Sequence, residues 1–558
     1  METLQLIEDL VLYAKKNLNP YNEDIVYARN QLCDFFGGLV PDENVVGRVR
    51  PLEEIMGDFI EHGLENGIIE EGEELRYETK LIGIVAPSPG LVVKTFTDIY
   101  ITRGSFQAAQ FLYNLSIRLN YIRLQDVKKN IRWNAEGPKG QICVTINLAK
   151  PEKDPKQVLA EKQFKGKKYP KCMLCLDNIG YAGSPVHPAR QTLRIVPVEL
   201  DGEDWHMQYS PYLYYDEHCI VFNDKHVPMQ ITAKTPRRLL HFTDFMPSYF
   251  LGSNADLPIV GGSILAHDHY QGGRKVLPMF KAEPRRIYEK NADVTVEVRD
   301  WYNSVISVKG HERGPVADRA AEIIEAWKNY NDESVGIISH TGDVPHNTVT
   351  PVATRNDGVY CVDLILRNNR TDEKHPFGIF HPTENMHNIK KESIGLIEAM
   401  GLFILPGRLK NELSALMDEL QKKEPDLERV FRDPNLAKHA GMLAQIMAEK
   451  GTGLTRKEAT DAVIGKVNEV CLKILECTAV FKNTPEGMEA FDRFMDFIVH
   501  QESKVEKPVP KKRGRKRKNP LPEPETNLSE GKAETEPETN LSEGKADTEP
   551  ATEKSETK

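Results

Sequence analysis

The residues best suited to chemistry lie in the segment 261–273, which reads Gly-Gly-Ser-Ile-Leu-Ala-His-Asp-His-Tyr-Gln-Gly-Gly. Its apolar lead-in predicts a strand, and the two-residue period of a strand puts His267, His269 and Gln271 on one face. The double glycines let backbone approach a bulky ligand, and exposed N–H groups there suit phosphate oxygens. Ser263 is a candidate phosphate contact, or part of a tight turn. A His-x-His pair alone also suits a metal site or polar surface, but the glutamine and glycines favour a nucleotide site.

A histidine in such a segment is suited to nucleophilic attack on phosphorus. Neutral imidazole offers a lone pair on one nitrogen while an acceptor holds the N–H of the other. The amide of Gln271 binds phosphoryl oxygens but donates no proton as a general acid. A leaving group that needs no protonation is therefore expected, such as a sugar 1-phosphate, whose second pKa is about 6 like that of other phosphate monoesters.

A second candidate is the Cys-Met-Leu-Cys knuckle formed by Cys172 and Cys175. In a cytosolic chain this spacing indicates half of a zinc site or a redox pair, and the absence of a thioredoxin-like βαβ pattern favours zinc. Zinc needs two further ligands, and His226 and His267 are the best candidates among sixteen histidines.

Composition excludes several classes of protein. The chain has 558 residues, a net charge of -10 and eight cysteines, too few for a disulfide framework. No secretory signal or membrane-length apolar run is present, so we expect a cytosolic protein without membrane contact. Residues 511–558 carry equal numbers of acidic and basic side chains, so all of the negative charge falls on residues 1–510. Such a body is a poor general binder of nucleic acid.

Periodicity along the chain predicts an α+β protein with antiparallel sheets. The first thirty residues read as helix, with a second helical stretch after Asn19-Pro20. From about residue 81 to 227 and again from 256 to 367, β-rich runs alternate with turns and a few helices, and helices dominate from about 391. Thr484, followed by Pro485, predicts the start of the last helix. The predicted strands are 142–148, 192–200, 219–222, 294–298 and 358–366, and the predicted later helices are 409–421, 437–449, 457–480 and the one from Thr484.

The end of the chain has a different composition. A thirteen-residue unit beginning at Pro524 is nearly repeated from Pro537, with one leucine in each copy, which predicts a disordered tail over 501–558. The run Lys511–Lys518 is similar to a minor-groove AT-hook, with Lys516 where the motif has proline. It suggests a weak contact with nucleic acid, or a solvated appendage.

Several motifs together give the chain a family resemblance over roughly residues 1–500. It resembles the class II (bacterial-type) galactose-1-phosphate uridylyltransferases of the histidine-triad superfamily. The motifs are the Cys172–Cys175 knuckle followed by Asn-x-Gly-Tyr, His187-Pro-Ala-Arg-Gln, Asn223-Asp-Lys-His, the 266–273 segment, Pro345-His-Asn-Thr, Leu366-Arg-Asn-Asn, and Phe380-His-Pro running into Ile389-Lys-Lys-Glu.

The resemblance implies double-displacement transfer of UMP between UDP-glucose or UDP-galactose and a hexose 1-phosphate, by a homodimer. His269 would be the nucleophile that forms uridylyl-histidine, and Gln271 would hold phosphoryl oxygens. The class I branch holds a structural metal, zinc or iron, with two cysteines and two histidines. The counterparts here are Cys172, Cys175, His226 and His267, although Leu-Ala-His-Asp-His stands where class I has Asn-Pro-His-Pro-His.

The resemblance also suggests substrate contacts and domain bounds. Arg367 is a candidate phosphate clamp because guanidinium binds phosphate in a forked geometry, although an arginine at a strand end is as often solvated. His346 and His381 are candidate contacts with sugar or nucleotide, with a structural role as the alternative. We expect an N-terminal uridylyltransferase domain (1–235), a C-terminal one (236–435), a helical extension (436–500) and the tail.

Two other functions stay open at this point. One is a histidine-triad nucleotide hydrolase or phosphorylase, against which Gln271 speaks. The other is a nucleic-acid-binding protein that works through Lys511–Lys518, against which the acidic body speaks.

Overall fold

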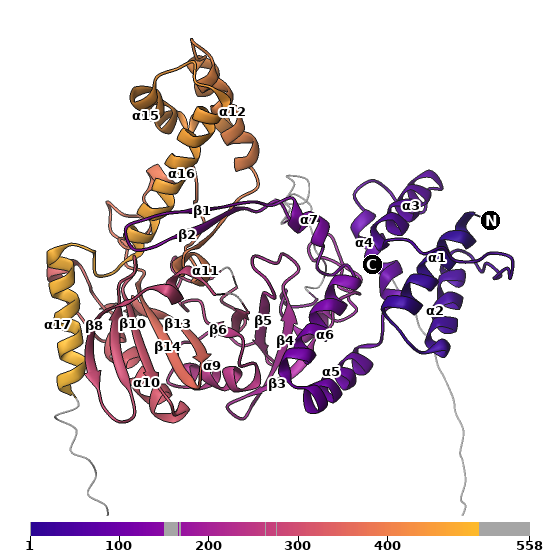
Figure 1. Cartoon of the computed structure of the whole chain (residues 1–558), viewed down its shortest axis with the longest axis horizontal. Coiled ribbons are helices and arrows are strands. Elements are labelled where there is room, and N and C mark those ends of the chain that lie inside the picture. The colour runs from indigo at the N-terminus through magenta and orange to yellow at the C-terminus, as the bar shows by residue number, and fades with distance from the viewer. Residues whose placement is uncertain (1, 150–165, 167–168, 263, 275, 502–558) are drawn as a thin grey trace, which may run out of the picture. The chain divides into compact units, whose positions relative to one another are not determined.

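The computed structural model describes residues 2–149, 166, 169–262, 264–274 and 276–501 (Figure 1). All of them belong to one compact unit, residues 1–505. Ser263, the basic run Lys511–Lys518 and the tail beyond residue 501 lie outside the described residues, so the predictions made for them are untested. Within the described ranges, no helix has the length and apolar character needed to cross a membrane.

Helices fill the N-terminal part of the chain. The two predicted helices are confirmed, with Leu6, Leu10 and Ala14 on the buried stripe of the first. The β-rich pattern expected from residue 81 is wrong as far as residue 130. There, apolar residues recur at helical spacing, and Ser88 accepts a hydrogen bond from the Leu91 N–H to cap a helix. These helices are α1 (Glu2–Asn17), α2 (Asn22–Phe35), α3 (Leu52–Glu65), α4 (Glu74–Val85), α5 (Pro89–Arg103), α6 (Ser105–Arg118) and α7 (Leu124–Lys128).

The centre of the fold is a ten-stranded sheet in which every neighbouring pair is antiparallel. This confirms the predicted α+β class with antiparallel sheets. In spatial order the strands are β3 (Val196–Leu200), β4 (Glu203–Tyr209), β5 (Cys219–Asn223), β7 (His269–Gly273), β6 (Phe250–Gly252), β13 (Asn347–Asn356), β14 (Val359–Asn368), β10 (Val305–Gly310), β9 (Thr295–Arg299) and β8 (Pro284–Lys290).

The two faces of this sheet belong to different cores. Helices α9 (Lys234–Phe245) and α10 (Arg313–Lys328) pack on one face, where Tyr270 and Leu364 join the larger apolar cluster (Figure 1). We call this the helix face. On the other face, Phe250 and Ile365 join a second cluster with residues from 386–405 and the later helices. We call this the loop face.

The second core also holds a three-stranded sheet and the C-terminal helices. The helices 409–421, 437–449, 457–480 and the one from Thr484 are confirmed, and Thr484 accepts from the Gly487 N–H as the predicted cap. The small sheet contains β1 (Ile131–Ala135), β2 (Ile142–Ile146) and β15 (Leu402–Leu405), and β11 (His340–Thr341) pairs with β12 (Val344–Pro345). The helices are α11 (Leu396–Ala399), α12 (Leu409–Gln421), α13 (Leu427–Arg432), α14 (Pro434–Ala437), α15 (Ala440–Lys450), α16 (Arg456–Thr478) and α17 (Pro485–Gln501).

Each of the five predicted strands overlaps an observed one, with ends that differ by a few residues. The division into domains at residues 235, 435 and 500 stays a prediction.

Candidate active site and metal centre

The His-x-His-x-Gln segment enters strand β7 only at His269. The predicted lead-in strand is wrong: the described residues 261, 262 and 264–268 form no ladder, because backbone groups of this stretch bond elsewhere. The Asp268 N–H donates to Val227 O at 2.7 Å, and Leu265 O accepts from the Met229 N–H at 2.9 Å. This stretch is therefore held beside the 226–229 segment, which carries His226.

The glycines that follow serve packing within the chain. A Cβ on Gly272 would lie 2.4 Å from Phe250 O, and one on Gly273 would lie 2.7 Å from the Tyr215 ring. These positions need glycine because strand β6 and Tyr215 approach them closely. At the first pair the chain also fills this space, with a Cβ on Gly261 2.6 Å from Ala255 O and one on Gly262 2.6 Å from Asn254 Nδ2, so contact of either pair with a ligand stays a prediction.

His269 is buried and its ring is held in one orientation. Its Nδ1 lies 2.8 Å from the backbone oxygen of His267, which can only accept, so Nδ1 carries the proton. Burial lowers the pKa of His269 to about 4, so the ring is neutral at pH 7. Among the described residues Nε2 has no hydrogen-bond partner. The lone pair of a neutral imidazole is thus left on Nε2, as attack on phosphorus requires.

Gln271 lies two residues further along the same face of β7, and its carbonyl is engaged. Its Oε1 lies 3.2 Å from Nε2 of His218, which donates to it. His218 is buried between Tyr214 and Tyr215, and burial lowers its pKa to about 4. Because Oε1 is used as an acceptor, the NH₂ group of Gln271 is oriented away from His218 and its two N–H bonds are left to bind phosphoryl oxygens.

This contact predicts a kinetic effect for His218. A His218→Phe variant keeps the aromatic packing but loses the donor, so the Gln271 amide is free to rotate. We expect kcat to fall by roughly tenfold to a hundredfold, the size of effect that small misplacements produce, with little change in melting temperature. His218→Gln, which retains an N–H donor, should recover part of the rate. Equal rates in wild type and His218→Phe would remove the positioning role.

Four sulfur and nitrogen donors converge beside this segment. Cys172, Cys175, His226 and His267 each offer one ligand atom, and these atoms all lie within 4.8 Å of one another. The two Sγ atoms are 3.6 Å apart, Cys172 Sγ lies 3.2 Å from His267 Nδ1, and Cys175 Sγ lies 3.2 Å from His226 Nδ1. The structure thus brings together the four residues that the sequence suggested.

The surroundings of this Cys/His cluster suit metal ligation. His267 Nε2 donates to Asn223 O at 2.8 Å, which leaves its Nδ1 as the lone pair facing the thiols. Tetrahedral zinc with bonds of about 2.3 Å to sulfur and 2.0–2.1 Å to nitrogen separates its ligand atoms by roughly 3.3–3.8 Å. The closest contacts in the cluster are 3.2–3.8 Å, and all four atoms lie within 4.8 Å of one another. Burial, with the adjacent Cys172 thiol, raises the pKa of Cys175 to about 11, so a cation would be needed to hold the thiolate at pH 7.

Asn178 shapes the knuckle that carries the two cysteines. Its Nδ2 donates to the backbone oxygens of Cys172 and Cys175 at 2.9 and 2.8 Å. Its Oδ1 accepts from His187 Nε2 at 2.6 Å. Both polar ends of this buried amide are therefore used, and they reinforce the bond from the Cys175 N–H to Cys172 O that closes the knuckle.

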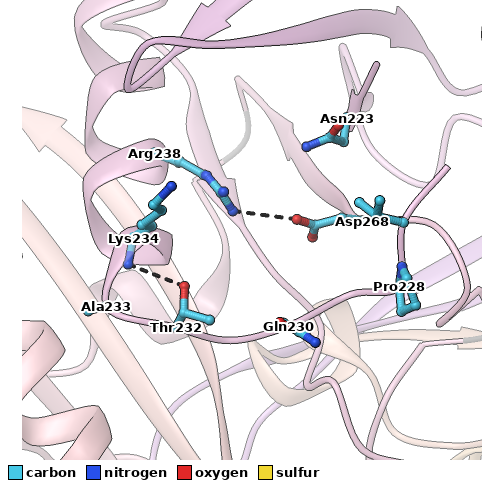
Figure 2. Close-up of a pocket in the computed structure, with 9 residues that line it drawn as sticks. Asn223, Pro228, Gln230, Thr232, Ala233, Lys234, Arg238 and Asp268 are labelled. Carbon is cyan, nitrogen blue, oxygen red and sulfur yellow. Dashed lines mark hydrogen bonds and ion pairs between the residues drawn. The ribbon is translucent and has the colours of Figure 1, made fainter. Parts of the chain in front are cut away.

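On the helix face, Asp268 lines a separate cavity of about 460 Å³ (Figure 2). Its carboxylate lies 3.5 Å from Arg238, which also pairs with Glu203 at 2.5 Å. Burial raises the pKa of Asp268 to about 6. Asp268 therefore points away from His269, as the alternation along the segment predicts, and its charge is matched within the chain.

The three later candidates differ in how their polar atoms are used. His346 has both nitrogens bonded, Nδ1 to Asn369 Oδ1 at 3.0 Å and Nε2 to Thr341 Oγ1 at 2.8 Å. This favours its structural alternative, and its contact with substrate stays a prediction. Arg367 and His381 are buried with unpartnered polar atoms, and their contact with substrate stays a prediction.

The comparisons place the chain among known enzymes. The family models "Galactose-1-phosphate uridyl transferase, N-terminal domain" and "C-terminal domain" match residues 22–228 and 243–431. The galactose-1-phosphate uridylyltransferase of Bacillus subtilis is 43% identical over 505 residues, covering 89% of this chain and 98% of that protein. That of Halalkalibacterium halodurans is 42% identical over 500 residues, covering 88% and 98%. The chain belongs to the galactose-1-phosphate uridylyltransferase family.

A solved structure, yeast Ap4A phosphorylase Apa2, is 12% identical with a TM-score of 0.29, covering 59% of this chain and 92% of that one. We base no argument on this likeness.

Three site residues of this family member were not singled out by sequence reasoning: His218, Asn178 and the backbone of Asn223. Asn178 and Asn223 lie inside motifs that carried the family resemblance, but a motif does not say which atom bonds to which. No signal in the sequence marks His218 as a functional residue. Its only distinctive neighbours in the sequence are Tyr214 and Tyr215.

Proposed function

We propose that this chain transfers UMP from UDP-glucose to galactose 1-phosphate, giving glucose 1-phosphate and UDP-galactose, by way of a uridylyl group on His269. Membership of the uridylyltransferase family supports the reaction. The observation that carries the role of His269 is its geometry: a buried, neutral ring whose Nδ1–H is bonded to His267 O and whose Nε2 is free.

In the first step Nε2 attacks the α-phosphorus of UDP-glucose. The N–P bond forms as the bond from phosphorus to the bridging oxygen breaks, and glucose 1-phosphate leaves with that electron pair. The ring becomes cationic with its proton still on Nδ1, where the bond to His267 O stabilises it. In the second step a phosphate oxygen of galactose 1-phosphate attacks the same phosphorus, and the N–P electron pair returns to Nε2.

No proton has to move in either step, which agrees with glutamine at position 271. The Gln271 NH₂ group, oriented by His218, donates to the phosphoryl oxygens as negative charge builds on them. A carboxylic acid or histidine would be expected here in an enzyme that must protonate its leaving group. This supports transfer over the alternative of a histidine-triad hydrolase that must protonate its leaving group.

We propose that Cys172, Cys175, His226 and His267 hold one structural zinc or iron ion. With four protein ligands the site is closed, so a bound metal supplies cross-linking and no open coordination position. For catalysis, these four residues fix the position of residue 267, whose carbonyl oxygen orients the His269 ring.

The function is tested by incubating the full-length protein with UDP-glucose and galactose 1-phosphate. We expect UDP-galactose and glucose 1-phosphate in equal amounts, measured by anion-exchange chromatography. Release of UMP without UDP-galactose would indicate the hydrolase. Absence of turnover, together with sequence-selective DNA binding at physiological salt, would make Lys511–Lys518 the functional element.

The homodimer, the cytosolic location and the weak contact of the tail with nucleic acid stay proposals. Sedimentation of the full chain decides the first.

A further inference from the structure

A second cavity, of about 450 Å³, lies between the N-terminal helices and the segment that follows the Cys172–Cys175 knuckle. Residues of α2, α4 and the first turn of α5 line it, together with residues 179, 180, 191 and 194. No described residue of its lining belongs to the 261–273 segment or to the Cys/His cluster. The cavity is therefore separate from the site of the proposed reaction, and it has the volume of a site for a small organic molecule.

The wall of this cavity contains a buried arginine with unused hydrogen-bond donors. Arg194 is only 5% exposed, and three backbone oxygens hold its guanidinium. Its Nε donates to Pro87 O at 2.8 Å, and its Nη1 donates to Gln191 O and Leu193 O, each at 2.9 Å. Its Nη2 has no partner in the part of the chain that the structure describes and, unlike Nε and Nη1 of Arg367, is not sealed off from solvent. The N–H bonds of Nη2 are therefore left for a group inside the cavity.

The charge of Arg194 is not matched by a carboxylate among the described residues. Burial lowers the pKa of Arg194 to about 10, and no neighbouring acid opposes this shift, so the side chain is charged at pH 7. Other buried arginines are paired with acids, Arg299 with Asp363 at 2.7 Å and Arg319 with Glu289 at 2.8 Å. Carbonyl oxygens satisfy donors but bring no net negative charge. A buried cation held in this way favours an anion beside it.

Two more positive features meet at the same cavity. Helix α5 begins beside the guanidinium, because Arg194 Nε is bonded to Pro87, the residue before the N-cap Ser88. Ser88 and Pro89 both line the cavity, and the first turn of this fifteen-residue helix carries partial positive charge. Lys80, an exposed residue of α4, adds a full charge to the lining. The three features together attract an anion more strongly than any one of them alone.

The other polar groups of the lining leave this positive charge in excess. Among the described lining residues the single acid is Asp24, which is exposed and accepts from Asn19 Nδ2 at 2.8 Å. The remaining groups include the amides of Gln191 and Gln31 and the hydroxyl of Tyr27, and Oε1 of Gln191 is buried without a partner. Neutral groups of this kind suit the hydroxyls of a small polar molecule. The cavity thus offers one anionic position and a polar surround.

We propose that this cavity is a second ligand site, which binds a small organic anion, either a phosphate ester or a polycarboxylate. The anionic group contacts Arg194 Nη2, the start of α5 and Lys80, and the polar remainder contacts Gln191 and its neighbours. Residues 179 and 180 of the lining directly follow Asn178, which shapes the knuckle. A bound anion therefore stabilises the wall that continues into the knuckle, and we expect it to raise the melting temperature.

The test uses Arg194→Gln and Lys80→Glu in the full-length protein, with Lys128→Glu as the matched control. Lys80 and Lys128 are both exposed lysines of N-terminal helices, but only Lys80 lines the cavity. Ribose 5-phosphate and citrate are titrated calorimetrically into each protein. We expect the anion that wild type binds to bind Arg194→Gln at least tenfold more weakly, about the loss of one charged hydrogen bond. Lys80→Glu should bind it about threefold to tenfold more weakly, as for an exposed charge, and Lys128→Glu should match wild type.

The outcomes separate this cavity from the reaction site. Weaker binding in the folded cavity variants, with an unchanged control, supports the second site, and the tighter of the two probes tells a phosphate ester from a polycarboxylate. Equal binding by wild type and both variants, judged to be folded by circular dichroism, would place the anion elsewhere and overturn the proposal. Absence of binding by wild type at millimolar concentrations would overturn it too, and would leave water in the cavity. If Arg194→Gln does not fold, Lys80→Glu decides alone. None of these results depends on the formation of UDP-galactose.

Discussion

A His269→Asn variant incorporates no labelled glucose 1-phosphate into UDP-glucose. Wild type performs this exchange without a second sugar phosphate, since the first step is reversible. Asparagine keeps an N–H that can reach His267 O but has no lone pair on nitrogen for attack on phosphorus. We expect exchange to fall about ten-thousandfold or more, as when a nucleophile is removed, with an unchanged circular dichroism spectrum.

His340→Asn is the control, because His340 is an exposed histidine on β11. It should exchange label at the wild-type rate. Retained exchange in His269→Asn would remove His269 from its role. Exchange in wild type that strictly required galactose 1-phosphate would instead argue for direct transfer between the two sugars, with no uridylyl-enzyme.

Replacing Cys172 by serine should remove the metal and destabilise the protein. Serine is a poor ligand for zinc, and the remaining three donors no longer close a tetrahedron. We expect metal content, measured by plasma mass spectrometry, to fall from about one ion per chain to near zero and the melting temperature to fall by several degrees. Activity should fall too, because the backbone of residue 267 loses its anchor.

Cys143→Ser is the matched control, since Cys143 is a half-buried cysteine on β2 outside the cluster. It should keep the metal. Wild-type protein with full activity and no bound metal would show that the cluster is held by packing alone. A Cys172–Cys175 disulfide that forms and breaks with activity would support the redox alternative.

The local part of the site follows from the sequence because it depends on neighbours along the chain. Alternation along one segment correctly separates His269 and Gln271 from Asp268 and Tyr270. The start of the strand was wrong, because β-propensity in the 261–265 stretch competes with backbone bonds to Val227 and Met229, which lie more than thirty residues away.

The part of the site that sequence could not supply depends on contacts between distant segments. His218 and Gln271 meet only because β5 pairs with β7, and Arg367 and His381 meet only because the loop after β14 folds back over it. Arg367 and His381 could be named separately, yet their closeness in space is a property of three-dimensional packing. Helices α4 to α6 could have been found from their helical spacing.

The hydrogen bond that fixes the His269 ring ends on a main-chain oxygen, which every amino acid at position 267 would provide. No substitution deletes this acceptor, although a substitution elsewhere can displace it. Inactivating missense changes should therefore spread to residues remote from the substrates, such as Asn178 beneath the knuckle and those around Asn223, whose carbonyl anchors His267. We therefore expect the effect of a mutation to depend more on whether the residue holds the His267 carbonyl oxygen in place than on its distance from the reacting phosphorus.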